Sequence, residues 1–151
     1  MKIIKISQTG IELIKSFEGF KGMAYKCPAG VPTIGYGTIR YPDGHKVKLG
    51  DVCTEQSAQV YLHHDLVSFE LAVDALCRDD INQNQFDALV SFCYNLGSGN
   101  LKISGLLKKV NTNPNDETIK LEFMKWVKAG GRTLPGLVKR REAESILYFT
   151  K

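Results

Sequence analysis

Three side chains near the start of the chain have residue types that can carry acid–base chemistry. Glu18 is followed after eight residues by Cys27, and Cys27 is followed after five residues by Thr33. A carboxylic acid can donate a proton as a general acid. A thiol becomes a base or a nucleophile only when its pKa falls below its usual value of about 8.5, and a hydroxyl group can accept a hydrogen bond from water. Taken singly, a glutamate is usually solvated and a threonine suits a strand, so the spacing alone is weak evidence.

The pattern around Glu18 predicts a helix from about Gly10 to Glu18. Thr9 and Glu12 match a capping box, and the residues that follow form a helical apolar stripe, Ile11, Leu13, Ile14 and Phe17. Gly19 then ends the helix. The negative end of the helix dipole disfavours the ionised form of a carboxyl group there by about 0.3–1 kcal/mol. Partial burial must supply the rest of the rise in pKa that a carboxyl group needs to act as a proton donor near neutral pH.

The segment from Met23 to about Val52 has the composition of a small antiparallel sheet. Glycines and prolines alternate there with short runs of Tyr, Ile, Thr and Val, and 28–30 and 42–44 are Pro-Ala-Gly and Pro-Asp-Gly turns. We expect two or three strands joined by hairpins, and such a sheet is too small to be stable without helices packed on it.

From Thr54 onward the pattern is helical. The expected helices cover about 54–77, 84–95, 104–110, 116–129 and 135–149, with stops at Gly-Ser-Gly 97–99 and at Gly130-Gly131. The whole chain, 1–151, therefore predicts one α+β domain with two lobes. A β-rich lobe of about 20–53 would pack on a mainly helical lobe of about 54–151 plus the N-terminal helix. The cleft between the lobes is where we expect the active site.

Composition limits the other possibilities. Hydrophobic residues make up 43% of the 151 residues and charged residues 24%, as in ordinary globular proteins. The four cysteines lack CxxC spacing, so we expect free thiols, with Cys77 and Cys93 in the core; a Cys27–Cys53 disulfide is left open. The three histidines form no ligand pattern, and we expect neither a metal nor a cofactor. No apolar run is long enough for a signal peptide or a membrane span, which predicts synthesis in the cytosol and no stable membrane insertion.

Positive charge is concentrated in the second half of the chain. Residues 1–80 carry a net charge of −1 and residues 81–151 a net charge of +5, and Lys120–Arg141 contains seven basic residues and one acid. Such a segment attracts polyanions, whether nucleic acid, an anionic membrane or an anionic cell wall. Lys139, Arg140 and Arg141 could bind wall carboxylates, although a solvated helix face is the more ordinary interpretation. A nucleic-acid-binding module is disfavoured because the chain shows no helix-turn-helix or RNA-binding signature.

Longer motifs match a known family in order along the chain. These are Ser16-Phe-Glu-Gly19, Ala24-Tyr25, Pro32-Thr-Ile-Gly-Tyr-Gly-Thr38, Asn84–Phe92, Tyr94-Asn-Leu-Gly97, Phe123, Trp126, Ala129-Gly-Gly131 and Leu134–Glu144. With the Glu, eight residues, Cys, five residues, Thr spacing, the chain resembles the phage-type lysozymes, glycoside hydrolase family 24, and most closely the lambdoid-type branch. The similarity extends over about residues 8–149.

The resemblance implies a peptidoglycan-degrading endolysin. Such an enzyme hydrolyses the β-1,4 bond between N-acetylmuramic acid and N-acetylglucosamine, with Glu18 as general acid. Thr33 and Cys27 would position the attacking water, and Gly35, Tyr36 and Gly37 would line the sugar groove. For Cys27, thiolate participation and no direct role stay open. The alternative is a lytic transglycosylase, which uses Glu18 without water and gives 1,6-anhydro products.

The resemblance also implies how the protein meets its substrate. We expect a monomer that is made in the host cytoplasm and binds bacterial peptidoglycan, and does not bind nucleic acid. It would act on the cell wall, in the periplasm, after a holin-type partner has permeabilised the membrane.

Overall fold

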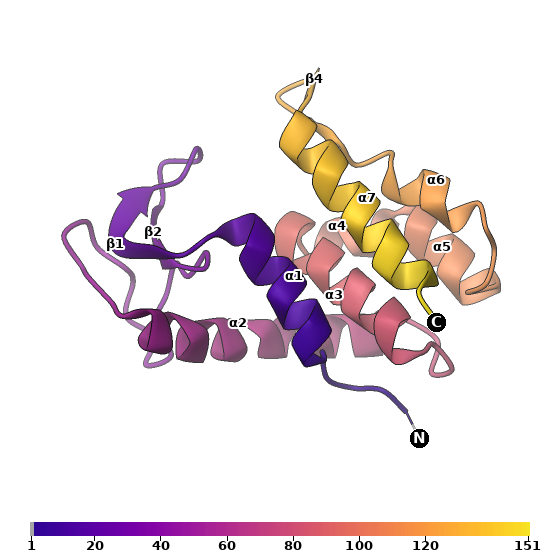
Figure 1. Cartoon of the computed structure of the whole chain (residues 1–151), viewed down its shortest axis with the longest axis horizontal. Helices are drawn as coiled ribbons and strands as arrows, with labels where there is room; N and C mark the ends of the chain where they lie inside the picture. The colour runs from indigo at the N-terminus through magenta and orange to yellow at the C-terminus, as the bar shows by residue number, and fades with distance from the viewer. Residues whose placement is uncertain (1) are drawn as a thin grey trace. The chain divides into compact units, whose positions relative to one another are not determined.

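The computed structural model describes residues 2–151, which fall into two compact units. Unit 1 holds the chain up to Leu13 together with Phe69–Lys151, and unit 2 holds Ile14–Ser68. Both boundaries fall inside helices, namely α1 (Gln8–Glu18) and α2 (Glu55–Leu76), which are labelled in Figure 1. The expected division into lobes of about 20–53 and 54–151 stays a prediction. Helices combined with small antiparallel sheets confirm the α+β class.

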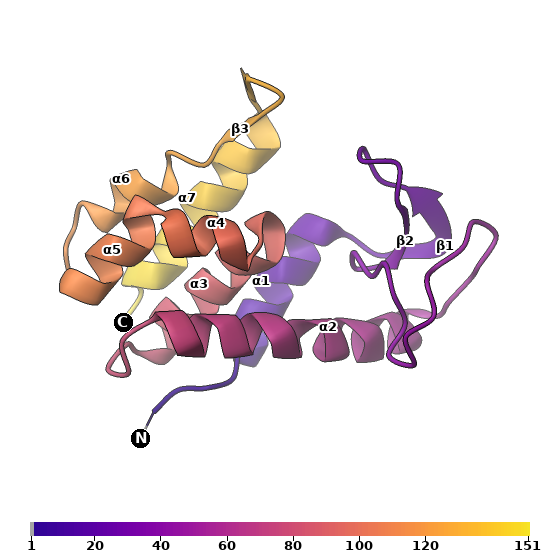
Figure 2. The ribbon, with the colours of Figure 1, turned by 180° about the vertical axis from the view of Figure 1, so that it is seen from behind.

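Unit 2 is built around a two-stranded antiparallel sheet. Strand β1 (Lys21–Lys26) pairs with β2 (Pro32–Gly35), and a long loop then leads into α2 (Figure 2). Three buried side chains of this unit form a cluster with two partly buried neighbours: Ala24, Ile34 and Val47, with Tyr41 and Cys53. The predicted small sheet is therefore confirmed. Two short strands are not stable alone, so the sheet needs the additional cover of other segments.

Unit 1 is a group of helices around one central helix, α3. Its elements are α3 (Gln83–Leu96), α4 (Ser98–Ile103), α5 (Gly105–Thr112), α6 (Ile119–Phe123), β3 (Lys128–Ala129), β4 (Arg132–Thr133) and α7 (Pro135–Phe149). Residues 85–93 of α3 are all buried, and α7 lies alongside it (Figure 1). A helix that is buried on every side belongs at the centre of a core.

The polar side chains of α3 are buried because each has an internal partner. The Asn82 side chain accepts a 2.8 Å hydrogen bond from the Gln85 amide, and the Asn82 amide donates a 2.9 Å hydrogen bond to the Gln85 side chain. Together the two bonds form a capping box. Asp87 accepts a 2.9 Å hydrogen bond from the amide of Ser7, and Ser91 donates a 2.6 Å bond to Glu144. Buried polar groups with partners cost little, whereas unpaired ones cost about 1–3 kcal/mol each.

Two expected features of the helical region are wrong. The helix expected over 116–129 is reduced to α6, because Asp116 holds the amide and hydroxyl of Thr118 in a turn before it. The sequence after α6 forms the β3–β4 hairpin, whose Gly130 and Gly131 have φ of 58° and 78°. Positive φ at both central residues is the geometry of a hairpin turn. The break between helices that was expected over 97–99 is a single residue, Gly97, because α4 already begins at Ser98.

The capping box expected at Thr9 and Glu12 is also wrong. Helix α1 begins at Gln8, so Thr9 lies inside it, and the amide and hydroxyl of Ser7, just before the helix, both bond to Asp87. Gly10 lies against the same aspartate, where a Cβ atom would come within 2.8 Å of the Asp87 side chain. The start of α1 is therefore fixed by a residue distant in sequence.

The burial of Arg140 and Arg141 contradicts the expectation that Lys139, Arg140 and Arg141 form a solvated or wall-binding face. Only Lys139 of the three is exposed, while Arg140 is 4% and Arg141 0% exposed. The Arg141 guanidinium lies 2.8 Å from the carboxylate of Glu144, and Arg140 lies 3.3 Å from it. Spacings of i, i+3 and i, i+4 bring these groups together on one face of α7.

We predict that Glu144→Gln destabilises the protein by about 3–5 kcal/mol, because it leaves a fully buried guanidinium without its counterion. The free energy of unfolding, measured by urea denaturation, checks this. Glu142→Gln, an exposed change on the same helix, should alter it by no more than about 0.5 kcal/mol. Equal stability of the Glu144→Gln variant and the wild type would contradict the role of the buried pair.

Candidate active site

Glu18 is the last residue of α1, where the sequence predicted it. Gly19 follows with φ of 70°, and its amide donates a 2.9 Å hydrogen bond to the Lys15 carbonyl. A glycine in the left-handed conformation is a common way to end a helix. The carboxyl group of Glu18 is thus presented, half-buried, at the point where the chain leaves the helix for β1.

The β1–β2 hairpin positions Cys27 and Thr33. Tyr25 is the cross-strand partner of Thr33, so the two side chains lie on the same face of the sheet. Cys27 begins the connecting turn, which is closed by hydrogen bonds from the Cys27 amide to the Val31 carbonyl at 3.0 Å and from the Gly30 amide to the Cys27 carbonyl at 2.7 Å.

Tyr25 connects the three candidate residues. Burial raises the pKa of the Tyr25 phenol, and the negative charges of Glu18 and Cys27 raise it further. Charges act on a titrating group in this way only when they are close to it. Glu18 and Cys27 are therefore both near enough to the Tyr25 phenol to act on it electrostatically, and Thr33 lies opposite Tyr25 on the neighbouring strand. All of these residues belong to unit 2.

The turn stabilises the charged form of Cys27. Backbone N–H groups of Val31 and Ala29 lower the pKa of the Cys27 thiol, and the Thr33 side chain adds to this effect. The thiol is also partly exposed. Backbone donors pointing at an anion are the usual way in which a turn binds negative charge. Cys27 can therefore act as a polar acceptor or as a thiolate at a lower pH than an ordinary cysteine.

Thr33 is held rigidly. Its side chain is 4% exposed, and its hydroxyl donates a 2.9 Å hydrogen bond to the Val31 carbonyl. Its single proton can be given to this carbonyl or, once Cys27 is a thiolate, to the sulfur, and in both cases the oxygen lone pairs stay available to accept another bond. Val31 thus contacts both candidates, through its carbonyl to Thr33 and through its amide to the Cys27 sulfur.

The other cysteines lie in different surroundings. All four thiols are free, and Cys77 and Cys93 are buried as predicted. Burial raises the pKa of Cys77 to about 12 and that of Cys93 to about 11. The fourth cysteine, Cys53, lies near the start of β1, because its amide donates a hydrogen bond to the Gly22 carbonyl. Cys27, in contrast, directly follows the end of that strand.

The predicted sugar-contacting residues form a tight turn after Thr33. Gly35 and Gly37 have φ of 67° and 96°. The ring of Tyr36 is 3% exposed and lies between Lys15, 5.3 Å from its centroid, and the Phe20 ring, with centroids 5.8 Å apart. Contact of these residues with sugar stays a prediction. In this structure Tyr36 supports the turn from within, and Gly37 is its more exposed glycine.

One pair that the sequence did not reveal supports the same turn. The hydroxyl of Thr38, which is 0% exposed, donates a 2.7 Å hydrogen bond to Asp65 on α2. The two residues are 27 positions apart, so no local pattern could have paired them. Thr38 was part of a recognised motif, but its partner could be found only from the fold.

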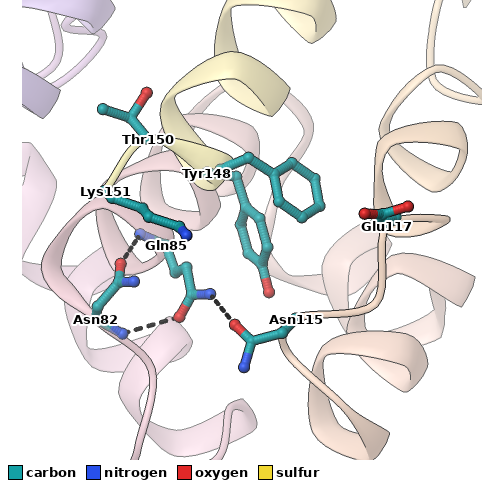
Figure 3. Close-up of a pocket in the computed structure, with 8 residues that line it drawn as sticks. Asn82, Gln85, Asn115, Glu117, Tyr148, Thr150 and Lys151 are labelled. Atoms are coloured by element: carbon teal, nitrogen blue, oxygen red, sulfur yellow. Dashed lines mark hydrogen bonds between the residues drawn. The ribbon is translucent and has the colours of Figure 1, made fainter.

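A separate hollow lies in unit 1, away from these residues in sequence. It has a volume of about 490 Å³ and is lined by residues from the start of α3, the segment before α6 and the end of α7 (Figure 3). Several of its polar wall groups bond to one another or to the backbone. Gln85 bonds to Asn82 and to the Pro114 carbonyl, and the Tyr148 hydroxyl donates to the same carbonyl at 2.7 Å. It contains no catalytic candidate.

Within residues 2–151, no group of three or more His, Cys, Asp or Glu side chains could hold a metal ion. None of the helices in the same range has both the length and the apolar character needed to span a membrane.

Comparisons with known proteins agree on one family. The sequence pattern of a family described as phage lysozyme matches residues 15–144. The endolysin of Bacillus phage B103 is 48% identical over 148 residues, which are 97% of this chain but only 55% of that relative. The endolysin of Acyrthosiphon pisum secondary endosymbiont phage 1 is 40% identical, over 95% of this chain and 97% of its own length. Among solved structures, an endolysin from Escherichia coli O157:H7 phage FAHEc1 has a TM-score of 0.89 and 37% identity, covering 99% of this chain and 96% of that one.

We predict that Cys27 reacts with iodoacetamide at lower pH than an unperturbed thiol, because the Val31 and Ala29 amides favour its thiolate. Mass spectrometry of digested protein gives the rate at each cysteine as a function of pH. Cys77 and Cys93 serve as internal controls and should stay unmodified in the folded protein. A Cys27 midpoint at or above about 8.5, the value of a free thiol, would contradict the stabilisation.

Proposed function

Because the chain belongs to the phage lysozyme family, we propose that it hydrolyses the β-1,4 bond between N-acetylmuramic acid and N-acetylglucosamine in bacterial peptidoglycan. The observation that carries the proposal is that Glu18, Cys27 and Thr33 lie at or next to the β1–β2 hairpin of unit 2. Glu18 and Cys27 both act on the Tyr25 phenol, and Thr33 acts on the Cys27 thiol. The relatives named above are endolysins, and this chain spans nearly all of one of them.

Glu18 is the proposed general acid. Cleavage of a glycosidic bond requires a proton on the leaving oxygen while positive charge develops on the sugar ring. The carboxyl group at the end of α1 is half-buried and close to the Tyr25 phenol. It can give its proton to the leaving oxygen, and the negative charge left on it then faces the positively charged sugar.

Thr33 and Cys27 are the proposed holders of the attacking water. The Thr33 hydroxyl directs its proton to the Val31 carbonyl, so its lone pairs can accept a hydrogen bond from water. The thiolate of Cys27, favoured by the turn amides, can accept the other proton as the water oxygen attacks the anomeric carbon. Attack by water from the face opposite the leaving group inverts the configuration. Attack by sulfur would form a covalent thioglycosyl intermediate, and its hydrolysis by water would give overall retention.

The alternative is a lytic transglycosylase. That reaction uses the same acid, but a hydroxyl group of the sugar attacks in place of water and a 1,6-anhydro ring forms. Only hydrolysis needs side chains that hold water. The rigid Thr33 hydroxyl beside a partly exposed thiol therefore favours the hydrolase.

The proposal extends to the setting of the reaction. A monomer made in the host cytoplasm would reach the wall, in the periplasm, after a holin-type partner permeabilises the membrane. Its exposed basic residues around the β3–β4 hairpin, Lys128, Arg132 and Lys139, suit an anionic wall polymer.

We predict that Glu18→Gln lowers the rate of wall lysis by about 10²–10⁴-fold, because glutamine keeps the size of the side chain but has no proton to donate. Loss of turbidity of a purified wall suspension measures the rate, and circular dichroism checks the fold. Glu12→Gln, an exposed change on the same helix, should lyse at the normal rate. Clearance by the Glu18→Gln variant at the wild-type rate would show that another residue is the acid.

A further inference from the structure

The turn that follows Thr33 determines where Thr33 lies. Ile34 and Thr38 exchange two backbone hydrogen bonds of 2.9 Å, which close residues 34–38 into a compact loop. Strand β2 has only four residues, and a sheet of two short strands is not stable alone. Thr33 is thus followed directly by a closed turn, and any movement of that turn moves the Thr33 hydroxyl.

One face of α2 holds this turn at three places. Glu55 accepts a 3.0 Å hydrogen bond from the Tyr36 hydroxyl. Ala58 lies so close to Gly35 that a Cβ atom on the glycine would be 3.0 Å from the alanine Cβ. Asp65 accepts the 2.7 Å bond from Thr38. Positions 55, 58 and 65 share a helix face because their spacings are close to whole turns.

The three contacts differ in strength. Glu55 is exposed, so its hydrogen bond competes with water. The Gly35–Ala58 contact excludes larger side chains but supplies no directional bond. Thr38 is fully buried, and its hydroxyl bonds to an aspartate that is itself partly buried. A hydrogen bond to a carboxylate in such surroundings is stronger than one between neutral groups.

We propose that Asp65 is a positioning residue: through Thr38 it holds the 34–38 turn, and thereby Thr33 and its contact with Cys27, in the geometry that hydrolysis requires. The inference rests on the proposed function for its catalytic consequence. Displacement of a catalytic group by about 1 Å can cost about 10²-fold in rate. The loss should include a fall in kcat, because the turn places Thr33. KM can change as well, because the same turn carries Gly35, Tyr36 and Gly37.

Four variants separate geometry from simple stability. Asp65→Ala removes the acceptor and Thr38→Val removes the donor with little change of shape. Asp65→Asn and Thr38→Ser keep an acceptor and a donor, and should restore the function. Gln59→Ala, an exposed change on α2, is the matched control. Circular dichroism fixes a temperature at which every variant is folded.

The first readout is steady-state kinetics on soluble, uncrosslinked peptidoglycan glycan chains. Asp65→Ala and Thr38→Val should lower kcat by about 10–10²-fold, whatever the accompanying change in KM. Asp65→Asn, Thr38→Ser and Gln59→Ala should stay within about threefold of the wild-type kcat. A rise in KM with unchanged kcat would overturn the proposal.

The second readout does not depend on enzymatic activity. The pH at which Cys27 reacts with iodoacetamide should rise in Asp65→Ala and Thr38→Val, because Thr33 then leaves the thiolate, and it should not change in Gln59→Ala. If these two variants lower only the melting temperature and leave both kcat and the Cys27 reaction unchanged, the proposal is wrong. A wild-type protein inactive on walls would refute the proposed function, and the thiol measurement would still decide the role of Asp65 in placing the turn.

Discussion

The pairing of Tyr25 with Thr33 across the β1–β2 hairpin is the constraint on which the candidate site depends. It fixes the length of the turn that begins at Cys27, and the turn amides that face the sulfur follow from that length. A shift of one residue would move Thr33 to the opposite face of the sheet. The end of α1 at Gly19 then delivers Glu18 to the same phenol that Cys27 approaches. Acid, thiol and hydroxyl are thus gathered by one turn and one helix end.

Unit 1 is stabilised in a different way. Helix α3 is buried on all sides, and its apolar residues are joined by polar ones whose partners come from distant segments. The ion pair of Arg141 with Glu144 lies in the same core and is fully buried. Such a pair adds little when intact, since desolvation offsets attraction, but it tolerates the loss of neither partner. The arrangement specifies how α7 lies on α3 more than it adds stability.

Much of this could be predicted from local patterns. The C-terminal end of α1, the small sheet and the core positions of Cys77 and Cys93 follow from glycine placement and apolar periodicity. The failures have different causes. Asp87, which is 80 positions from Ser7, replaced the expected cap of α1. Glu144 pairs with two arginines of its own helix, and Asp116 holds Thr118 in a local turn. At the β3–β4 hairpin, Gly130-Gly131 is itself a hairpin signal, although it equally suits the end of a helix. The roles of Glu18, Cys27 and Thr33 came from spacing and family resemblance, and their catalytic action stays a proposal.

The central claim is that a proton from Glu18 and a water held beside Thr33 and Cys27 together cleave the glycan chain. Mass analysis of the muropeptides released from purified sacculi tests it most directly, because hydrolysis and transglycosylation leave products that differ by one water molecule. The account predicts new reducing N-acetylmuramic acid ends and no new 1,6-anhydro ends. Products that carry 1,6-anhydro rings, or sacculi left chemically unchanged by the folded protein, would contradict it.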